Sequence, residues 1–62
     1  MPKSQGERIA VIRERHGLSI EQAAARIGVT YGSVRRWERE KKSPTSDSNR
    51  RAVEAFLADP RP

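Results

Sequence analysis

Two glycines, each followed two residues later by a hydroxyl side chain, constrain the fold of this chain more than any other feature. Gly17 precedes Ser19, and Gly28 precedes Thr30. Glycine readily adopts the left-handed conformation that ends a helix. A serine or threonine hydroxyl accepts hydrogen bonds from the free N–H groups at the start of the next helix, and Gln22 completes a capping box with Ser19. The pattern predicts a short central helix with tight connections on both sides.

The rest of the chain is also predicted to be helical. Apolar residues recur at three- and four-residue spacing, and glycine and proline fall between the periodic segments. A polar loop covers residues 41–46, and Pro60 ends the last helix because proline cannot continue the hydrogen-bond ladder. The predicted helices cover residues 5–16, 20–27, 31–40 and 47–58. We therefore expect an all-α single domain over residues 1–62, a compact four- to five-helix bundle with an ordered core at 5–58 and a flexible tail at 59–62.

The length of 62 residues limits what the chain can enclose. A domain of this size buries only about 60% of the surface that its unfolded chain exposes, so it has no large side chains to spare for a buried catalytic cleft. The sequence has no cysteine, no nucleophile–base pair, no glycine-rich phosphate loop and no metal-ligand cluster. We expect no enzymatic activity, no cofactor and no small-molecule ligand. The predicted core residues are Ile9, Val11, Ile12, Leu18, Ile20, Ile27, Val29, Val34, Trp37, Val53, Phe56 and Leu57.

Charge and hydropathy indicate the class of partner. No apolar run is long enough for a membrane span or a signal peptide, so we expect a cytoplasmic protein. The formal charge of +5, from 13 basic and 8 acidic residues, suits a polyanionic partner. Many basic proteins bind no nucleic acid, so the location of the charge has to decide.

The predicted third helix, residues 31–40, has two different faces. At about 100° per residue, Val34 and Trp37 fall on one side with Glu38 beside them. Two short helices joined by a glycine-containing turn form a helix-turn-helix, whose second helix enters the major groove of DNA. Arginine there can form two hydrogen bonds with guanine or pair with phosphate. An isolated cationic helix face would more often be a solvated surface, but this context favours DNA binding. The outward side carries Gly32, Arg35, Arg36 and Arg39.

Residues 6–45 resemble the Cro/repressor (XRE-type) helix-turn-helix family, which has a lambda-repressor-like DNA-binding domain. The resemblance covers most of the chain and rests on the joint spacing of its motifs. It implies a small bacterial or phage transcriptional regulator, usually a repressor, that binds double-stranded DNA. The matching residues are Ile9, Ile12, Arg13, Gly17-Leu18-Ser19, Glu21-Gln22-Ala23-Ala24, Ile27-Gly28-Val29-Thr30, Ser33, Val34, Trp37-Glu38 and Lys41-Lys42-Ser43-Pro44.

The resemblance also implies roles for individual positions. Arg13 and Glu38 match a pair that forms a buried salt bridge between the first and third helices in some members, and such a pair holds register more than it adds net stability. Positions that contact base edges or nearby phosphates are Tyr31, Gly32, Ser33 and Arg36. Positions in the loop that holds the DNA backbone are Lys41, Lys42 and Thr45. Together with the capping hydroxyls and the arginine face, the predicted DNA-binding residues are Ser19, Thr30, Tyr31, Gly32, Ser33, Arg35, Arg36, Arg39, Lys41, Lys42 and Thr45.

Three positions depart from the family pattern. Ile20 stands where members often have a glutamine that contacts DNA, so any contact there has to come from backbone N–H groups. Glu40 replaces the glycine that usually follows the third helix, which would allow that helix to continue. Residues 46–49 are polar where members usually begin an apolar fourth helix, so the packing of the C-terminal helix is the least constrained by the resemblance.

Several residues have two interpretations from sequence alone. Gly32 either clears space for DNA or is an indifferent first-turn residue. Tyr31 either contacts DNA or only shields the core, whereas Trp37 is interpreted as core. Phe56 and Leu57 are candidates for a dimer surface and equally for the core.

The leading functional hypothesis is a sequence-specific DNA-binding regulator with the third helix in the major groove. One such helix reads too few base pairs to find a site in a genome, so we expect a homodimer on a palindromic operator. Two alternatives remain open. The first is an architectural or excisionase-like recombination factor, and the second is an antitoxin or anti-repressor module that binds an acidic protein.

Overall fold

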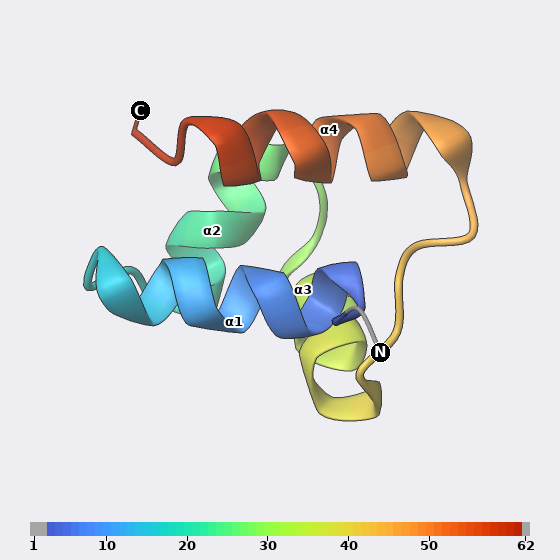
Figure 1. Cartoon of the computed structure of the whole chain (residues 1–62), viewed down its shortest axis with the longest axis horizontal. Helices are drawn as coiled ribbons and strands as arrows, with labels where there is room; N and C mark the ends of the chain where they lie inside the picture. Colours follow the sequence, from blue (N-terminus) through green and yellow to red (C-terminus); the bar gives the residue numbers. More distant parts are fainter. Residues whose placement is uncertain (1–2, 62) are drawn as a thin grey trace.

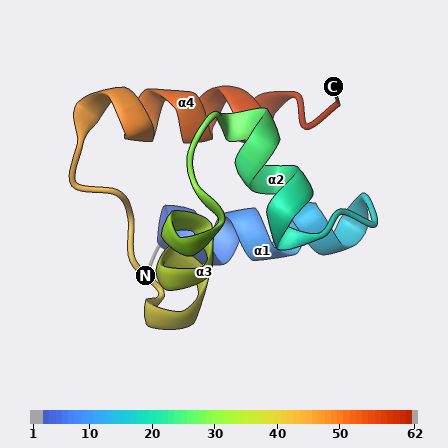
Figure 2. The ribbon, with the colours of Figure 1, turned by 180° about the vertical axis from the view of Figure 1, so that it is seen from behind.

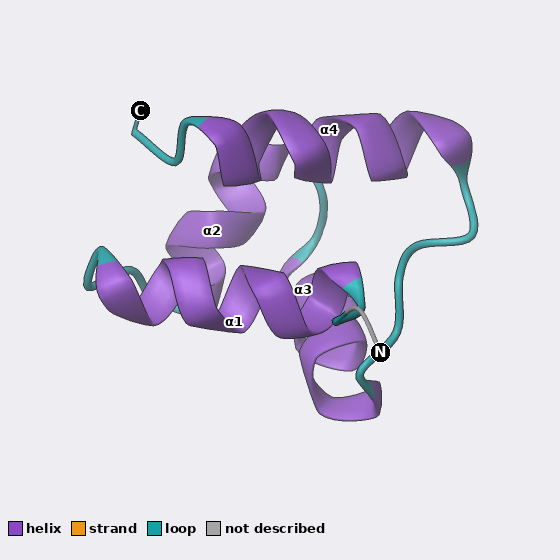
Figure 3. Ribbon diagram, in the orientation of Figure 1, coloured by secondary structure: helices purple, strands orange, loops and turns teal. Residues whose placement is uncertain are grey.

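The computed structural model describes residues 3–61, and within that range the chain forms four α-helices and no strand (Figure 3). These are α1 (Gln5–Arg15), α2 (Ile20–Ile27), α3 (Tyr31–Glu40) and α4 (Asp47–Ala58). The predicted all-α helix-turn-helix fold is confirmed, and the predicted bounds agree except that α1 ends one residue early, with His16 as its C-cap.

The helices surround one core. α1 and α4 run across the view in the same direction, and α2 connects the region beside α1 to the region beside α4 (Figure 1). α3 lies at the lower edge, beneath the start of α1, and the view from behind shows α2 and α3 together as the helix-turn-helix (Figures 1 and 2).

The predicted helix caps are confirmed. Gly17 and Gly28 adopt positive φ angles of 66° and 91°. The backbone N–H of Gln22 donates to Ser19 Oγ at 3.0 Å, and the Gln22 side chain accepts from the Ser19 N–H at 2.8 Å. Thr30 Oγ1 accepts from the backbone N–H of residue 33 at 3.2 Å. These local bonds explain why the chain breaks and restarts its helices where it does.

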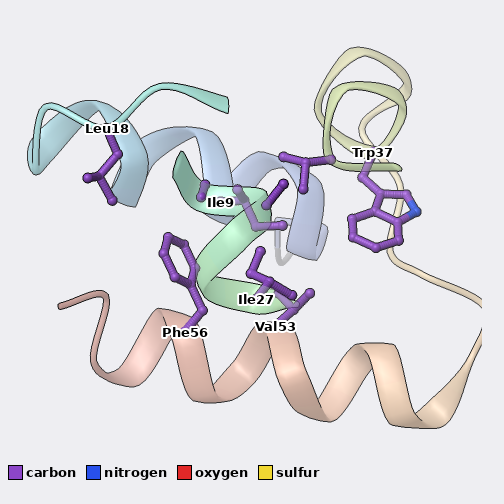
Figure 4. Packing of buried hydrophobic residues seen from close by; sticks show 9 residues of the cluster. Ile9, Leu18, Ile27, Trp37, Val53 and Phe56 are labelled. Carbon is purple, nitrogen blue, oxygen red and sulfur yellow. The ribbon is translucent and has the colours of Figure 1, made fainter. Parts of the chain in front are cut away.

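The core lies between the four helices, and Trp37 of α3 lies at its edge (Figure 4). Ile9, Val34 and Val53 are fully buried. The prediction that Val11 belongs to the core is wrong, because it lies about 200° around α1 from Ile9 and its side chain is 39% exposed. The buried apolar residues are Ile9, Leu18, Ala23, Ala24, Ile27, Val34, Trp37, Val53 and Phe56, with Ile12, Ile20, Val29, Ala52 and Leu57 packed against them.

The C-terminal segment packs more closely than its sequence indicates. Ser46 caps the polar start of α4. Farther along that helix, the Phe56 side chain is only 3% exposed. Pro60 is buried, and its carbonyl oxygen accepts a hydrogen bond from Arg26 Nη1 at 2.8 Å. Flexibility of residues 59–61 stays a prediction, and residue 62 lies outside the described range.

The possibility that α3 continues past Glu40 is wrong. The next residue, Lys41, adopts a left-handed conformation (φ 55°, ψ 50°), and its N–H is directed to the carbonyl oxygen of Trp37 as the helix cap. The N–H of Lys42 bonds to the same oxygen at 3.0 Å. A non-glycine residue in this conformation costs roughly 1–2 kcal/mol, so the surrounding contacts have to hold it.

Those contacts come from the start of α1. The N–H of Gly6 donates to the carbonyl oxygen of Lys42 at 3.0 Å, and the N–H of Gln5 donates to Ser43 Oγ at 3.0 Å. A Cβ on Gly6 would lie 2.1 Å from the carbonyl oxygen of Trp37 and 2.6 Å from that of Lys42. α1 and the end of α3 therefore meet backbone to backbone, which only glycine permits here.

A second link between the two helices is ionic. Arg13 Nε and Nη2 donate to the two carboxylate oxygens of Glu38 at 3.0 and 2.9 Å, and both side chains are largely buried, at 18% and 11% exposure. The bond to Glu38 raises the pKa of Arg13 above its ordinary value, against the opposing effect of burial. Arg13 Nη1 also donates to the carbonyl oxygen of Leu18, so the pair fixes both α3 and the turn before α2.

We predict that Gly6→Ala destabilises the protein by about 3 kcal/mol, because the new Cβ would force two backbone segments apart. The measurement is urea unfolding followed by Trp37 fluorescence and circular dichroism. The matched control is Gly32→Ala, whose Cβ would meet no atom within 4 Å, and which should be neutral or up to about 1 kcal/mol more stable. Equal stability of Gly6→Ala and the parent would contradict the close approach.

We also predict that Glu38→Gln destabilises the protein by about 3 kcal/mol, since it leaves the buried Arg13 guanidinium without its carboxylate. The double variant Arg13→Met/Glu38→Leu should recover much of that loss, because an apolar pair carries no unpaired charge. Chemical denaturation of the parent and both variants makes the comparison. A double variant less stable than Glu38→Gln would show that packing at this site, and not the lost charge, dominates.

Candidate nucleic-acid interface

The outward face of α3 forms an open hollow lined by residues of that helix alone. Its members come from positions that share one side of the helix at 100° per residue, and all are exposed. The Tyr31 side chain is 51% exposed. The opposite face of the same helix is closed by the buried Val34 and Trp37. The lining residues are Tyr31, Gly32, Arg35, Arg36 and Arg39.

The arginines on this face differ in whether they already contact a carboxylate. Within residues 3–61, neither Arg35 nor Arg36 forms an ion pair, whereas Arg39 Nη2 lies 4.0 Å from a carboxylate oxygen of Glu40. Glu38 is turned away into its pair with Arg13. Two guanidinium groups therefore stand free beside the hollow, where they could donate in pairs to base edges or phosphates.

Gly32 is the one residue lining the hollow that has no side chain. A Cβ added there would meet no atom within 4 Å, so the fold itself does not require glycine. Glycine in a helix costs about 1 kcal/mol relative to alanine. The space that a side chain would fill at Gly32 is open.

The predicted hydroxyl residues lie at helix starts. Ser19 and Thr30 are exposed N-caps of α2 and α3, and Ser33 Oγ lies 2.9 Å from Thr30 Oγ1 in a half-buried position. Ser19 Oγ accepts from the Gln22 N–H, and Thr30 Oγ1 accepts from the Ser33 N–H and shares a second hydrogen bond with Ser33 Oγ. Helix N-termini also favour anions, so both caps could approach phosphates.

Ile20, by contrast, is a packing residue. It is partly buried against the core cluster at the start of α2. Any contact at this position has to come from the backbone, as its sequence predicts.

The loop after α3 adds cations to one end of the hollow. Lys41, Lys42 and Thr45 are exposed, and the loop between them is anchored by the buried Pro44. Lys42 Nζ lies 3.5 Å from a carboxylate oxygen of Glu40. Lys41 and Lys42 therefore lie at the end of α3, from which the loop rises toward α4 (Figure 1).

Sequence reasoning missed the residues that support this loop. Gly6, Gln5 and Ser43 fix its backbone through the bonds to α1 described above. A glycine inside the first turn of a helix was the available signal, since it weakens the helix unless something approaches closely.

Other kinds of site find little support in the part of the chain that the structure describes. In residues 3–61 there is no group of three His, Cys, Asp or Glu side chains that could hold a metal ion. No helix in that range is both long and apolar enough to cross a membrane. A second, more apolar hollow lies between α1 and α4, lined by Lys3, Arg8, Val11, Ile12 and Leu57.

Comparison with known proteins agrees with this geometry. A family model described as helix-turn-helix matches residues 9–56, which include all of α2 and α3 and most of α1 and α4. No curated protein and no solved structure is significantly similar to the chain. On the strength of the family match, the chain belongs to the XRE-type (Cro/C1) helix-turn-helix family of DNA-binding transcription regulators.

Proposed function

We propose that this protein is a sequence-specific repressor, of bacterial or phage type, that binds a palindromic operator as a homodimer with α3 in the major groove. The observation that carries the proposal is the division of α3 into a closed face and an open cationic face. A helix that is anchored on one side can present the other side to base edges with little loss of conformational entropy on binding.

The residues divide into two kinds of contact. Arg35 and Arg36, which are free of ion pairs within the described range, suit bidentate recognition of guanine in the major groove. Lys41, Lys42 and Thr45 lie in the loop past the helix end, where contacts to phosphate fix orientation but carry no sequence information. Ser19 and Thr30 at the helix starts would complete the contacts to the backbone.

The homodimer is proposed because one helix contacts too short a stretch of DNA to specify a site. One helix reads only a few base pairs, and helix-turn-helix dimers bind half-sites about 34–36 Å apart. The described chain extends 25 × 22 × 21 Å, less than that separation, so two copies would fit on neighbouring half-sites without overlapping. Phe56 is buried and unavailable as a dimer contact, whereas Leu57 lines the hollow that includes the exposed Val11.

Selection of bound duplexes from a random library tests the proposal. We expect a palindromic motif with half-sites one helical turn apart, followed in titrations by tighter binding to that motif than to a scrambled duplex. Equal affinity for both duplexes at every salt concentration would overturn sequence specificity. A single unrepeated half-site would overturn the dimer.

Two variants should separate base contacts from phosphate contacts. We predict that Arg36→Ala costs about 1–3 kcal/mol of operator binding and relaxes one base position. Lys42→Ala should weaken operator and scrambled duplexes alike and should lower the slope of log affinity against log salt by about 1. Fluorescence titrations over a range of salt concentrations measure both effects. If Arg36→Ala weakened all sequences equally, Arg36 would be a phosphate contact.

Gly32→Ala tests the hollow itself. The substitution should leave the fold intact or more stable, because nothing lies within 4 Å of the new Cβ. If DNA approaches α3 at this point, operator affinity should fall by about tenfold or more, since a clash replaces a contact. Thermal unfolding and operator titration are measured on the same preparation. Unchanged affinity would show that Gly32 is an indifferent first-turn residue.

A further inference from the structure

We infer that Glu40 acts as an electrostatic brake on DNA binding by competing with phosphates for the cations at the end of α3. This inference rests on the proposed function. Glu40 is the last residue of α3, and its side chain is 35% exposed. Its carboxylate lies between two predicted DNA-binding cations, 4.0 Å from Arg39 Nη2 and 3.5 Å from Lys42 Nζ. It also lies one helical turn after Arg36, at the border of the open face.

Fold stability does not account for a carboxylate at this place. The C-terminal end of a helix carries partial negative charge, so an acidic side chain there is unfavourable. Ion pairs between exposed side chains contribute too little free energy to offset this unfavourable interaction. Within residues 3–61, Glu40 makes no side-chain hydrogen bond that would tie it to another element.

The geometry also argues against a positioning role. A carboxylate that orients a cation for its ligand forms short, directional bonds, as Glu38 does with Arg13 at 2.9 and 3.0 Å. The contacts of Glu40 are longer and lack hydrogen-bond geometry. They neutralise charge without fixing direction.

The consequence for DNA is a reduced electrostatic contribution. The Glu40 carboxylate neutralises part of the charge with which Arg39 and Lys42 would attract a phosphate, and it also repels the DNA backbone. Phosphate contacts supply nearly all of the non-specific affinity of a DNA-binding protein. Weaker contacts shorten residence on non-operator DNA, which offers a genome-wide excess of competing sites.

The test is Glu40→Gln, compared with Glu14→Gln. Both variants raise the net charge by one unit, but Glu14 is exposed near the end of α1 and distant in sequence from the open face of α3. We expect Glu40→Gln to bind operator and scrambled duplexes about threefold to tenfold more tightly at low salt, with the advantage fading as salt rises. The slope of its log affinity against log salt concentration should steepen by about one to two, which corresponds to one or two additional phosphate contacts. Glu14→Gln should change affinity much less.

The outcomes separate this inference from the proposed function. If the parent protein binds no duplex, the proposed function fails. If the parent binds its operator and Glu40→Gln matches Glu14→Gln, only the brake is overturned. A selective loss of operator binding in Glu40→Gln would also overturn the brake, because it would show that the carboxylate contacts a base such as cytosine. Thermal unfolding checks that both variants are folded.

Discussion

The position of α3 depends on its contact with α1, and the rest of the interface depends on that position. Gly6 allows the first turn of α1 to reach the last carbonyl groups of α3, and the pair of Arg13 with Glu38 joins the same helices farther along. These links have different physical characters. The first is a steric match between two backbones, and the second is a nearly buried charge pair that is costly to break. Together they fix where α3 lies and which face it presents.

This arrangement explains how so small a core can hold α3 in one orientation. The three largest fully buried side chains, Ile9, Val34 and Val53, are aliphatic residues from three different helices. They hold the helices together, but apolar packing tolerates small rotations of one helix against another. Directional bonds such as those of Arg13 do not tolerate such rotations. The core therefore supplies most of the stability, while the polar links determine the orientation of α3 and of its open cationic face.

Sequence reasoning was successful where the cause of a structure is local. Helix ends at Gly17 and Gly28 follow from backbone freedom and from capping bonds three residues apart, so they can be recognised in a linear sequence. The two faces of α3 follow from helical period. The close contact between Gly6 and Lys42 joins residues far apart in the chain, so no periodic pattern in the sequence predicts it. The exposure of Val11 was missed because an apolar residue between Ile9 and Ile12 looks like core until its angle around the helix is considered.

The end of α3 shows where local preference and function diverge. Lys41 adopts a conformation that glycine would occupy at lower cost, and Glu40 places a carboxylate against the negative end of the helix. Neither residue is what stability alone would favour, and both adjoin the open cationic face. Strain of this kind persists when surrounding contacts hold it, as the bonds from Gln5 and Gly6 do here. A lysine in the left-handed conformation retains a cation at the turn that glycine could not supply, while the adjacent Glu40 carboxylate lies against the two neighbouring cations, Arg39 and Lys42.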